Sequence, residues 1–391
     1  MAAKLHRDGF FWTIALQTVV VNFFLGGFGP AQPLLRADQG TSLKIAGLHG
    51  TAMGIASIAA GLTLPWIAHR FGRANAGWIG LTIFSGGLIA LATVQPVQLT
   101  ILAALVTGYG CSTVINSFVV SLNSHYGAMA PLAVAQANGI ASAGYVLGTF
   151  TIGTIARTAP DFWRLGLILI LPLALYLFFF RRIKNADAHT PTSDGPQSGK
   201  LSKAYWLTWL GFVATISTEF ATSFWAAALV QDRTKASDAI SVIAIMALGT
   251  GMGLGRFFGG RILHKLSLDR QLITILFIQL FSFFGIWFSH SLVISLIALL
   301  FNGLGISMQF ALTSLRMISH SDGRPDLAIG KSSLAAGIAI GGAPFLLGVL
   351  GDSYGISRAY MMVPALIAFA IAIVVLVPSH MSQEELDRLE A

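Results

Sequence analysis

Charged side chains are scarce in this sequence: only 10% of its 391 residues are Asp, Glu, Lys or Arg, compared with about 25% in an average soluble domain. Apolar residues make up 55%, and the mean hydropathy is +0.74. A chain of this size has too little interior volume to bury so much apolar surface in one globular core. The composition therefore excludes an ordinary water-soluble enzyme and a disordered chain, and it indicates a protein whose solvent is the lipid bilayer.

Cysteine is nearly absent, and so are the motifs of enzymes. Cys111 is the only cysteine, which excludes a fold held by disulfides within the chain. The sequence contains no HExxH motif and no Walker loop, and its 9 histidines are dispersed. We therefore expect no enzyme, no metal and no cofactor. A membrane-embedded enzyme or a receptor is the alternative class, and either would produce no solute flux across a sealed membrane.

Long apolar runs are what the sequence does contain. A helix needs about 20 apolar residues to cross a hydrocarbon core of roughly 30 Å. The first run is too long for a signal peptide and no clear cleavage site follows it, so we interpret it as a retained helix. We expect twelve transmembrane helices, near residues 10–34, 45–68, 74–94, 99–122, 132–156, 163–180, 205–230, 239–263, 272–288, 292–315, 327–350 and 359–377.

One polar segment divides these runs into two sets of six. Residues 181–204 contain Pro191 and Pro196 and show no helical apolar period. We interpret this segment as a cytoplasmic linker. It separates a first half, residues 1–180, from a second half, residues 205–391.

Internal similarity supports this division. Gly108 and His125 in the first half match Gly303 and His320 in the second, and both pairs are separated by 195 residues. Transporter folds are often built from duplicated halves. The sequence therefore predicts two pseudo-symmetric halves.

Basic residues predict how the helices are oriented. Most of the 24 Lys and Arg residues, Arg316 among them, lie at the termini or in alternate loops on one side of the predicted membrane. Positive residues near helix ends resist translocation. We therefore expect both termini in the cytoplasm and a multi-pass protein of the cell membrane, inner or plasma. The net charge of +8 then reflects this topology rather than nucleic-acid binding.

The segment between the second and third runs carries a family resemblance. Residues 65–73 read PWIAHRFGR and resemble, most clearly at Arg70 and Arg73, the G-x-L-A-D-R-x-G-R signature of the major facilitator superfamily. The resemblance implies an all-α membrane protein of twelve helices in two pseudo-symmetric halves that works by alternating access. It assigns Arg70, Arg73, His69 and the second-half counterpart His264 to gating. Both histidines stand where the signature has aspartate, which weakens the expectation of a charge-dependent gate.

Two further segments resemble the fucose-permease-like branch of this family. They are residues 217–230, STEFATSFWAAALV, and residues 252–262, MGLGRFFGGRI. The resemblance implies a sugar-like substrate taken up with protons. Acidic residues expected for that chemistry in the first and fourth helices are absent, and Asn22 and Asn116 stand in these helices instead.

Glu219 is the only carboxylate well inside an apolar run. An acid near the membrane midplane costs about 2.5 to 3.5 kcal/mol on insertion scales, and such groups usually face a bundle interior or a water-filled cavity. We therefore assign Glu219 to proton coupling, in which it binds and releases a proton as the cavity alternates between sides. A structural hydrogen bond is the alternative.

Arg256 is the second charge within an apolar run. It lies in the cytoplasmic third of the eighth predicted helix, where its side chain can snorkel to the interface or take part in gating. Binding of an anionic substrate is the alternative. We do not expect Arg256 to pair with Glu219, because Glu219 lies more than half-way towards the outer face.

Neutral polar residues in the first, fourth, seventh and tenth helices suit a small polar solute. In the family that the chain resembles, these helices line the cavity. Amides donate to and accept from hydroxyl groups, and an aromatic ring stacks on a sugar face. Interhelical hydrogen bonding is the alternative for each amide. We assign substrate binding to Asn22, Asn116, Trp225, Asn302 and Gln309.

Together these features predict a secondary active transporter that moves a small polar, sugar-like solute, with protons as the coupling ion. We expect a monomer in the lipid bilayer and no nucleic-acid partner. The alternative is proton-coupled export of amphipathic or drug-like compounds. It predicts broad, weak recognition by the aromatic residues Phe118, Phe224, Trp225 and Phe310.

Overall fold

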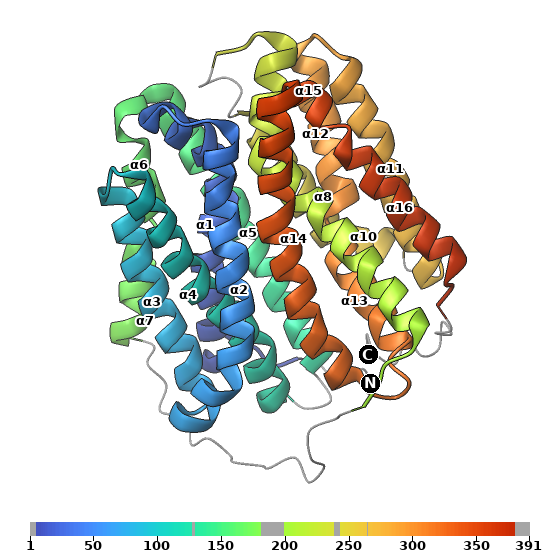
Figure 1. Cartoon of the computed structure of the whole chain (residues 1–391). Coiled ribbons are helices and arrows are strands. Elements are labelled where there is room, and N and C mark those ends of the chain that lie inside the picture. The colour runs from blue at the N-terminus through green and yellow to red at the C-terminus, as the bar shows by residue number, and fades with distance from the viewer. Residues whose placement is uncertain (1–4, 127–129, 181–198, 238–242, 264, 380–391) are drawn as a thin grey trace.

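The computed structural model is a bundle of long helices. It describes residues 5–126, 130–180, 199–237, 243–263 and 265–379 (Figure 1). Within these residues, 12 helical segments are long and apolar enough to cross a membrane. The predicted all-α membrane fold of twelve helices is therefore confirmed. Most of the predicted linker, residues 181–198, and His264 lie outside the described residues.

The helices form two bundles that lie side by side, the first blue to green and the second yellow to red in Figure 1. The first bundle comprises α1 (Gly9–Gln39), α2 (Leu43–Phe71), α3 (Arg73–Thr93), α4 (Val97–Tyr126), α5 (Ala130–Thr158), the short η2 (Pro160–Phe162), α6 (Trp163–Ile168) and α7 (Leu171–Phe180). The second comprises α8 (Lys203–Thr234), α10 (Ile243–Leu263), α11 (Leu268–Phe288), α12 (Leu292–Ile306), α13 (Gln309–Ser319), α14 (Pro325–Tyr354), α15 (Ile356–Ala359) and α16 (Met362–Leu376).

Three of the predicted spans are interrupted helices. The sixth consists of α6 and α7, the tenth of α12 and α13, and the twelfth of α15 and α16. In the tenth span the break falls at Ser307 and Met308, close to the middle of the membrane-crossing segment. Apolar length alone predicts a span but does not locate such a break, because the segment Leu292–Ser319 is apolar when averaged over its length.

Small residues set how closely the helices approach. A side chain on Gly148 of α5 would overlap the backbone of Phe23 in α1, and one on Gly26 of α1 would overlap the backbone of Tyr145 in α5. The two helices therefore pack backbone against backbone, as small-residue faces allow in membranes. Cys111 of α4 is buried in the core of the same half and is only 3% exposed.

One such contact joins the two halves. A Cβ on Gly54 of α2 would lie 2.5 Å from the Gly337 carbonyl oxygen of α14. Thr51 of α2 also donates a hydrogen bond to the Gly341 carbonyl oxygen at 3.0 Å. Helices α2 and α14 therefore form a close contact across the boundary between the halves.

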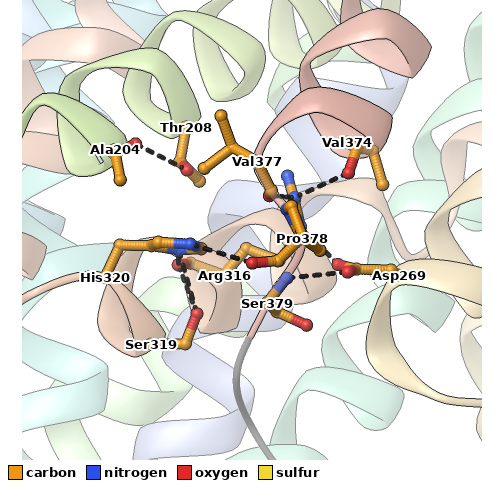
Figure 2. A network of polar contacts seen from close by, with 10 residues as sticks. All are labelled: Ala204, Thr208, Asp269, Arg316, Ser319, His320, Val374, Val377, Pro378 and Ser379. Atoms are coloured by element: carbon orange, nitrogen blue, oxygen red, sulfur yellow. Dashed lines mark hydrogen bonds and ion pairs between the residues drawn. The ribbon is translucent and has the colours of Figure 1, made fainter.

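The chain enters α1 and leaves α16 at the same end of the bundle (Figure 1). A polar network at this end fixes the segment that follows α16 (Figure 2). Arg316 of α13 is 1% exposed and donates to Asp269 at 2.7 Å and to the Val377 carbonyl oxygen. Asp269 also accepts from the Ser379 backbone N–H at 2.7 Å. Arg316 is thus a buried structural residue as well as one of the basic residues used to predict orientation.

Candidate functional site

A small cavity lies between the two halves of the bundle. Its volume is about 50 Å³, so it has room for a few water molecules in this conformation. Helices α1, α2 and α5 contribute its wall on one side, and α8 and α10 contribute the other. The lining residues are Asn22, Leu25, Phe28, Gly29, Met53, Tyr145, Glu219, Phe220, Ser223, Phe224 and Arg256.

Both intramembrane charges line this cavity and face each other. Arg256 Nη2 lies 3.5 Å from Glu219 Oε1, and the two side chains are 29% and 14% exposed. The expectation that they would not pair is therefore wrong. Glu219 lies at the centre of α8, and Arg256 lies about one turn from the centre of α10, so the arginine side chain is long enough to reach the carboxylate.

The break between α12 and α13 helps to hold Arg256. At this break the Ser307 carbonyl oxygen accepts a hydrogen bond from Arg256 Nε at 3.4 Å. On the other side, the guanidinium carbon lies 5.9 Å from the ring centroid of Tyr145 in α5, within the range of a cation–π contact. Arg256 therefore contacts an acid of its own half, a backbone carbonyl of its own half and an aromatic ring of the other half.

The predicted substrate-binding residues separate into two groups. Asn22 lines the cavity, where its Nδ2 donates to the Thr18 carbonyl oxygen at 2.9 Å. Trp225 is buried and does not line it, because its indole N–H donates to the Pro344 carbonyl oxygen of α14 at 2.8 Å. Asn116 is half-buried on α4 and is also outside the cavity lining.

Asn302 and Gln309 belong to a buried amide cluster inside the second half. Gln309 Nε2 lies 2.6 Å from Gln279 Oε1, and Asn302 Nδ2 donates to the Gln279 carbonyl oxygen at 3.2 Å. Gln279 in turn donates to Thr218 of α8 at 3.0 Å. In this conformation these amides join helices of one half, and their assignment to substrate binding remains a prediction.

The predicted gating residues lie at one end of α2 and α3. His69 and Arg70 are exposed in the last turn of α2, and Arg73 begins α3. Their assignment to a gate also remains a prediction. Arg256, predicted for the gate as well, is instead found in the cavity with Glu219.

An aspartate that was not predicted from the sequence joins the two halves at the opposite end of α2 from His69 and Arg70. Asp352, in the last turn of α14, accepts from the backbone N–H groups of Leu43 at 3.0 Å and Lys44 at 2.8 Å, in the first turn of α2. The sequence could have identified Asp352 as a candidate residue by its spacing from the glycine that follows α14. Asp352 precedes Gly355, whose φ is +81°, by three residues, just as His69 precedes Gly72, whose φ is +89°.

Comparisons with known proteins agree with this architecture. The family model of the Major Facilitator Superfamily matches residues 14–323. No curated protein sequence matches the chain.

Two solved structures are similar over nearly the whole chain. A bacterial homolog of the human lysosomal transporter Spinster, in an inward-facing and occupied conformation, is 13% identical, with a TM-score of 0.69 and 96% of each chain covered. The human organic anion transporter MFSD10 (TETRAN) is 15% identical, with a TM-score of 0.68 and coverage of 95% of this chain and 100% of that one. At these identities the likeness is one of fold.

Proposed function

Because this chain belongs to the major facilitator superfamily and is a membrane transporter rather than an enzyme, we propose that it moves a small polar solute by alternating access, with protons as the coupling ion. The observation that carries this proposal is the pairing of Glu219 with Arg256 in a cavity between the halves. Ionisable groups at this depth are costly and usually functional. In a transporter, the free-energy cost of an ionisable group in the membrane is explained if that group must change its charge during the cycle.

The two halves, residues 1–180 and 205–391, move against each other around this cavity in the proposed cycle. The linker, residues 181–204, connects them on the cytoplasmic side, and the protein acts as a monomer in the cell membrane. Entry into α1 and exit from α16 at one end of the bundle support the placement of both termini on one side (Figure 1). The distribution of Lys and Arg favours the cytoplasm as that side. In the paired state Glu219 is ionised and held by Arg256. When Glu219 binds a proton, the ion pair is lost and Arg256 is free to contact the solute.

Export of amphipathic compounds is the second candidate, and the cavity lining favours it in one respect. Phe28, Phe220 and Phe224 contribute aromatic surface to the cavity. Of the aromatic residues predicted for this function, Phe224 lines the cavity, whereas Phe118, Trp225 and Phe310 do not. Polar-solute transport is the better supported candidate, because the charged pair occupies the same small space as these rings.

Proton coupling is tested with Glu219→Gln in sealed proteoliposomes that contain a pH-sensitive dye. We expect a transported solute to acidify the lumen in the wild-type protein and not in the variant, because glutamine does not bind the coupling proton. Counterflow, the exchange of labelled for unlabelled solute, requires no net proton movement and should persist. The matched control is Asp161→Asn, which removes an exposed carboxylate that is not part of the cavity lining. Unchanged acidification with Glu219→Gln would show that this residue is structural.

A further inference from the structure

The guanidinium of Arg256 has hydrogen-bonding capacity that its described partners leave unused. Arginine carries five N–H donors, and the contacts of Arg256 to Glu219 and to Ser307 are long, at 3.5 and 3.4 Å. Arg316 provides an internal comparison, because it donates to Asp269 at 2.7 Å and also to two backbone carbonyls, those of Val374 and Val377. Arg316 has short contacts to Asp269 and to the Val377 carbonyl oxygen and a longer one, of 3.4 Å, to Val374, whereas both polar contacts described for Arg256 are long and Arg256 lies at the edge of a cavity.

The group that best fits a guanidinium with free donors is a planar oxyanion. A carboxylate can accept two parallel N–H bonds from arginine, and such bidentate pairs are among the strongest hydrogen-bonded contacts in proteins. Glu219 makes only one long contact of this kind, through Oε1. The cavity therefore contains a carboxylate-binding group that its resident carboxylate does not saturate.

The charge balance of the cavity links anion binding to the protonation of Glu219. With Glu219 ionised, the pair is neutral, and an entering anion would add an uncompensated negative charge next to that carboxylate in a low-dielectric space. With Glu219 protonated, Arg256 is left with an uncompensated positive charge that an anion neutralises. Among the described residues, the other titratable side chains near the pair are Tyr145 of α5 and Tyr360 at the end of α15, whose hydroxyl donates to the Ala221 carbonyl oxygen of α8. The cavity residues from α1 and α2 do not titrate.

The apolar part of the cavity lining indicates what kind of group the solute carries besides its charged group. Asn22 and Ser223 are further, uncharged polar residues of the lining. Leu25, Met53 and Phe220 line the cavity, together with Phe28 and Phe224. These side chains offer apolar surface and no further charge. A small solute with one carboxylate and an apolar body satisfies both the arginine and this lining.

We propose that the solute is a small monocarboxylate with an apolar body, a polar solute through its charged group. Its carboxylate replaces Glu219 as the partner of Arg256, and the solute is therefore carried together with the proton that neutralises Glu219. The inference rests on the proposed transport function and names the substrate class of the same cavity. It also gives Arg256 the role of a substrate-binding residue.

Pairs of ligands that differ only in charge test the proposal. The probes are propionate with propionamide, butyrate with butyramide, and benzoate with benzamide, measured as shifts in the melting temperature of the purified full-length protein at about pH 5.5 and about pH 8. We expect at least one carboxylate to stabilise the wild-type protein at the lower pH and much less at the higher pH, and its amide to have no effect. In Glu219→Gln the same carboxylate should stabilise the protein at both pH values.

The double variant Glu219→Gln with Arg256→Gln keeps the cavity neutral and leaves no uncompensated buried charge, so it is the control least expected to misfold. It should lose the response to carboxylates. Equal stabilisation by carboxylate and amide, a response that persists in the double variant, or no response to any carboxylate would overturn the proposal. Carboxylate binding without lumen acidification beyond that of protein-free liposomes, into which the undissociated acid diffuses unaided, would contradict the proposed proton-coupled transport instead. Acidification driven by a neutral solute alone would contradict only the anionic substrate class.

Discussion

Two buried ion pairs of the second half, Arg316–Asp269 and Arg256–Glu219, differ in the number of their short contacts. In the Arg316–Asp269 pair, Arg316 also donates to the Val377 carbonyl oxygen and Asp269 also accepts from the Ser379 backbone N–H, both in the segment after α16 (Figure 2). The Glu219–Arg256 pair has one long contact and faces a cavity. Breaking a saturated buried pair mainly costs stability, because it leaves an uncompensated charge. In the proposed transport function, breaking the loosely held pair beside the cavity also changes what the cavity can bind.

Asp8 supplies a pH dependence at the residue scale, outside the membrane-spanning segments. It caps α1 by accepting from the Phe11 N–H at 2.9 Å, and it contacts His125 at 2.7 Å and Tyr126 at 2.8 Å. Burial raises the pKa of the Asp8 carboxyl, but the hydrogen bonds from Phe11, His125 and Tyr126 outweigh burial and hold that pKa below its ordinary value. The same carboxylate, together with burial, raises the pKa of Tyr126 to about 12.

The direction in which Asp8 changes stability with pH follows from the linkage between protonation and folding. A carboxyl whose pKa is lower in the folded state contributes stability above its unfolded pKa of about 3.9, and this contribution disappears as the pH falls through the folded pKa. We therefore expect Asp8→Asn to lower the melting temperature near neutral pH and to matter progressively less below about pH 4. Melting curves of both proteins across this range measure it. A difference that grows as the pH falls would contradict this account of Asp8.

At the scale of helices, the first turn of α2 depends on the other half of the molecule. The first N–H groups of a helix have no partner within the helix. Ser42 satisfies the N–H of Ile45, and Asp352 of α14 satisfies those of Leu43 and Lys44. A carboxylate at this position also interacts favourably with the positive end of the helix dipole. The start of α2 is thus capped by both halves.

Asp352→Asn tests this contact by hydrogen exchange. An amide has one acceptor oxygen in place of the two that bind Leu43 and Lys44, so we expect exchange in the first turn of α2 to accelerate by about tenfold, corresponding to roughly 1.4 kcal/mol of lost protection. Exchange mass spectrometry of the peptide that contains these residues gives the rate. The control is again Asp161→Asn, an exposed carboxylate at η2. Unaltered protection in the Asp352 variant would mean that the first turn of α2 is ordered without the second half.

The elements also show what the sequence could predict and what it could not. Apolar length identifies all twelve spans, because crossing a bilayer requires a fixed number of residues. The same runs do not reveal the break at Ser307 and Met308, nor how each helix is rotated. Glu219 was identified because a carboxylate in an apolar run is conspicuous, whereas its pairing with Arg256 depends on the rotation and depth of two helices. Rotation likewise directs Gln309 and Asn302 towards Gln279 rather than the cavity.

At the scale of the whole molecule, the two halves meet through backbone-to-backbone contact of α2 with α14. Gly54 is central to this contact, because a Cβ there would lie 2.5 Å from the Gly337 carbonyl oxygen. Any larger side chain must separate the halves at this point or distort one helix. Alternating access requires the halves to approach and separate in turn. In the proposed cycle, the glycine therefore matters for the movement of the halves more than for the formation of either half.

Gly54→Val should reduce transport at least about tenfold while leaving the helix content unchanged, because the valine keeps α2 and α14 apart. Flux into proteoliposomes and circular dichroism are the two measurements. Gly86→Val is the matched control, since a Cβ on Gly86 of α3 meets nothing within 4 Å. Loss of helix content in Gly54→Val, or equal loss of flux in both variants, would argue against this role of the contact.

The burial of Cys111 makes the native chain a convenient starting point for spectroscopy. A thiol that is 3% exposed inside the first half reacts slowly with maleimide or methanethiosulfonate reagents. Fluorophores or spin labels can therefore be attached to one new cysteine on each half without first removing the native one. Gln98 at the start of α4 and Ser353 at the end of α14 are exposed positions for such a pair. Changes in the distance between the two labels would report the movement of the halves directly, with an otherwise unmodified protein.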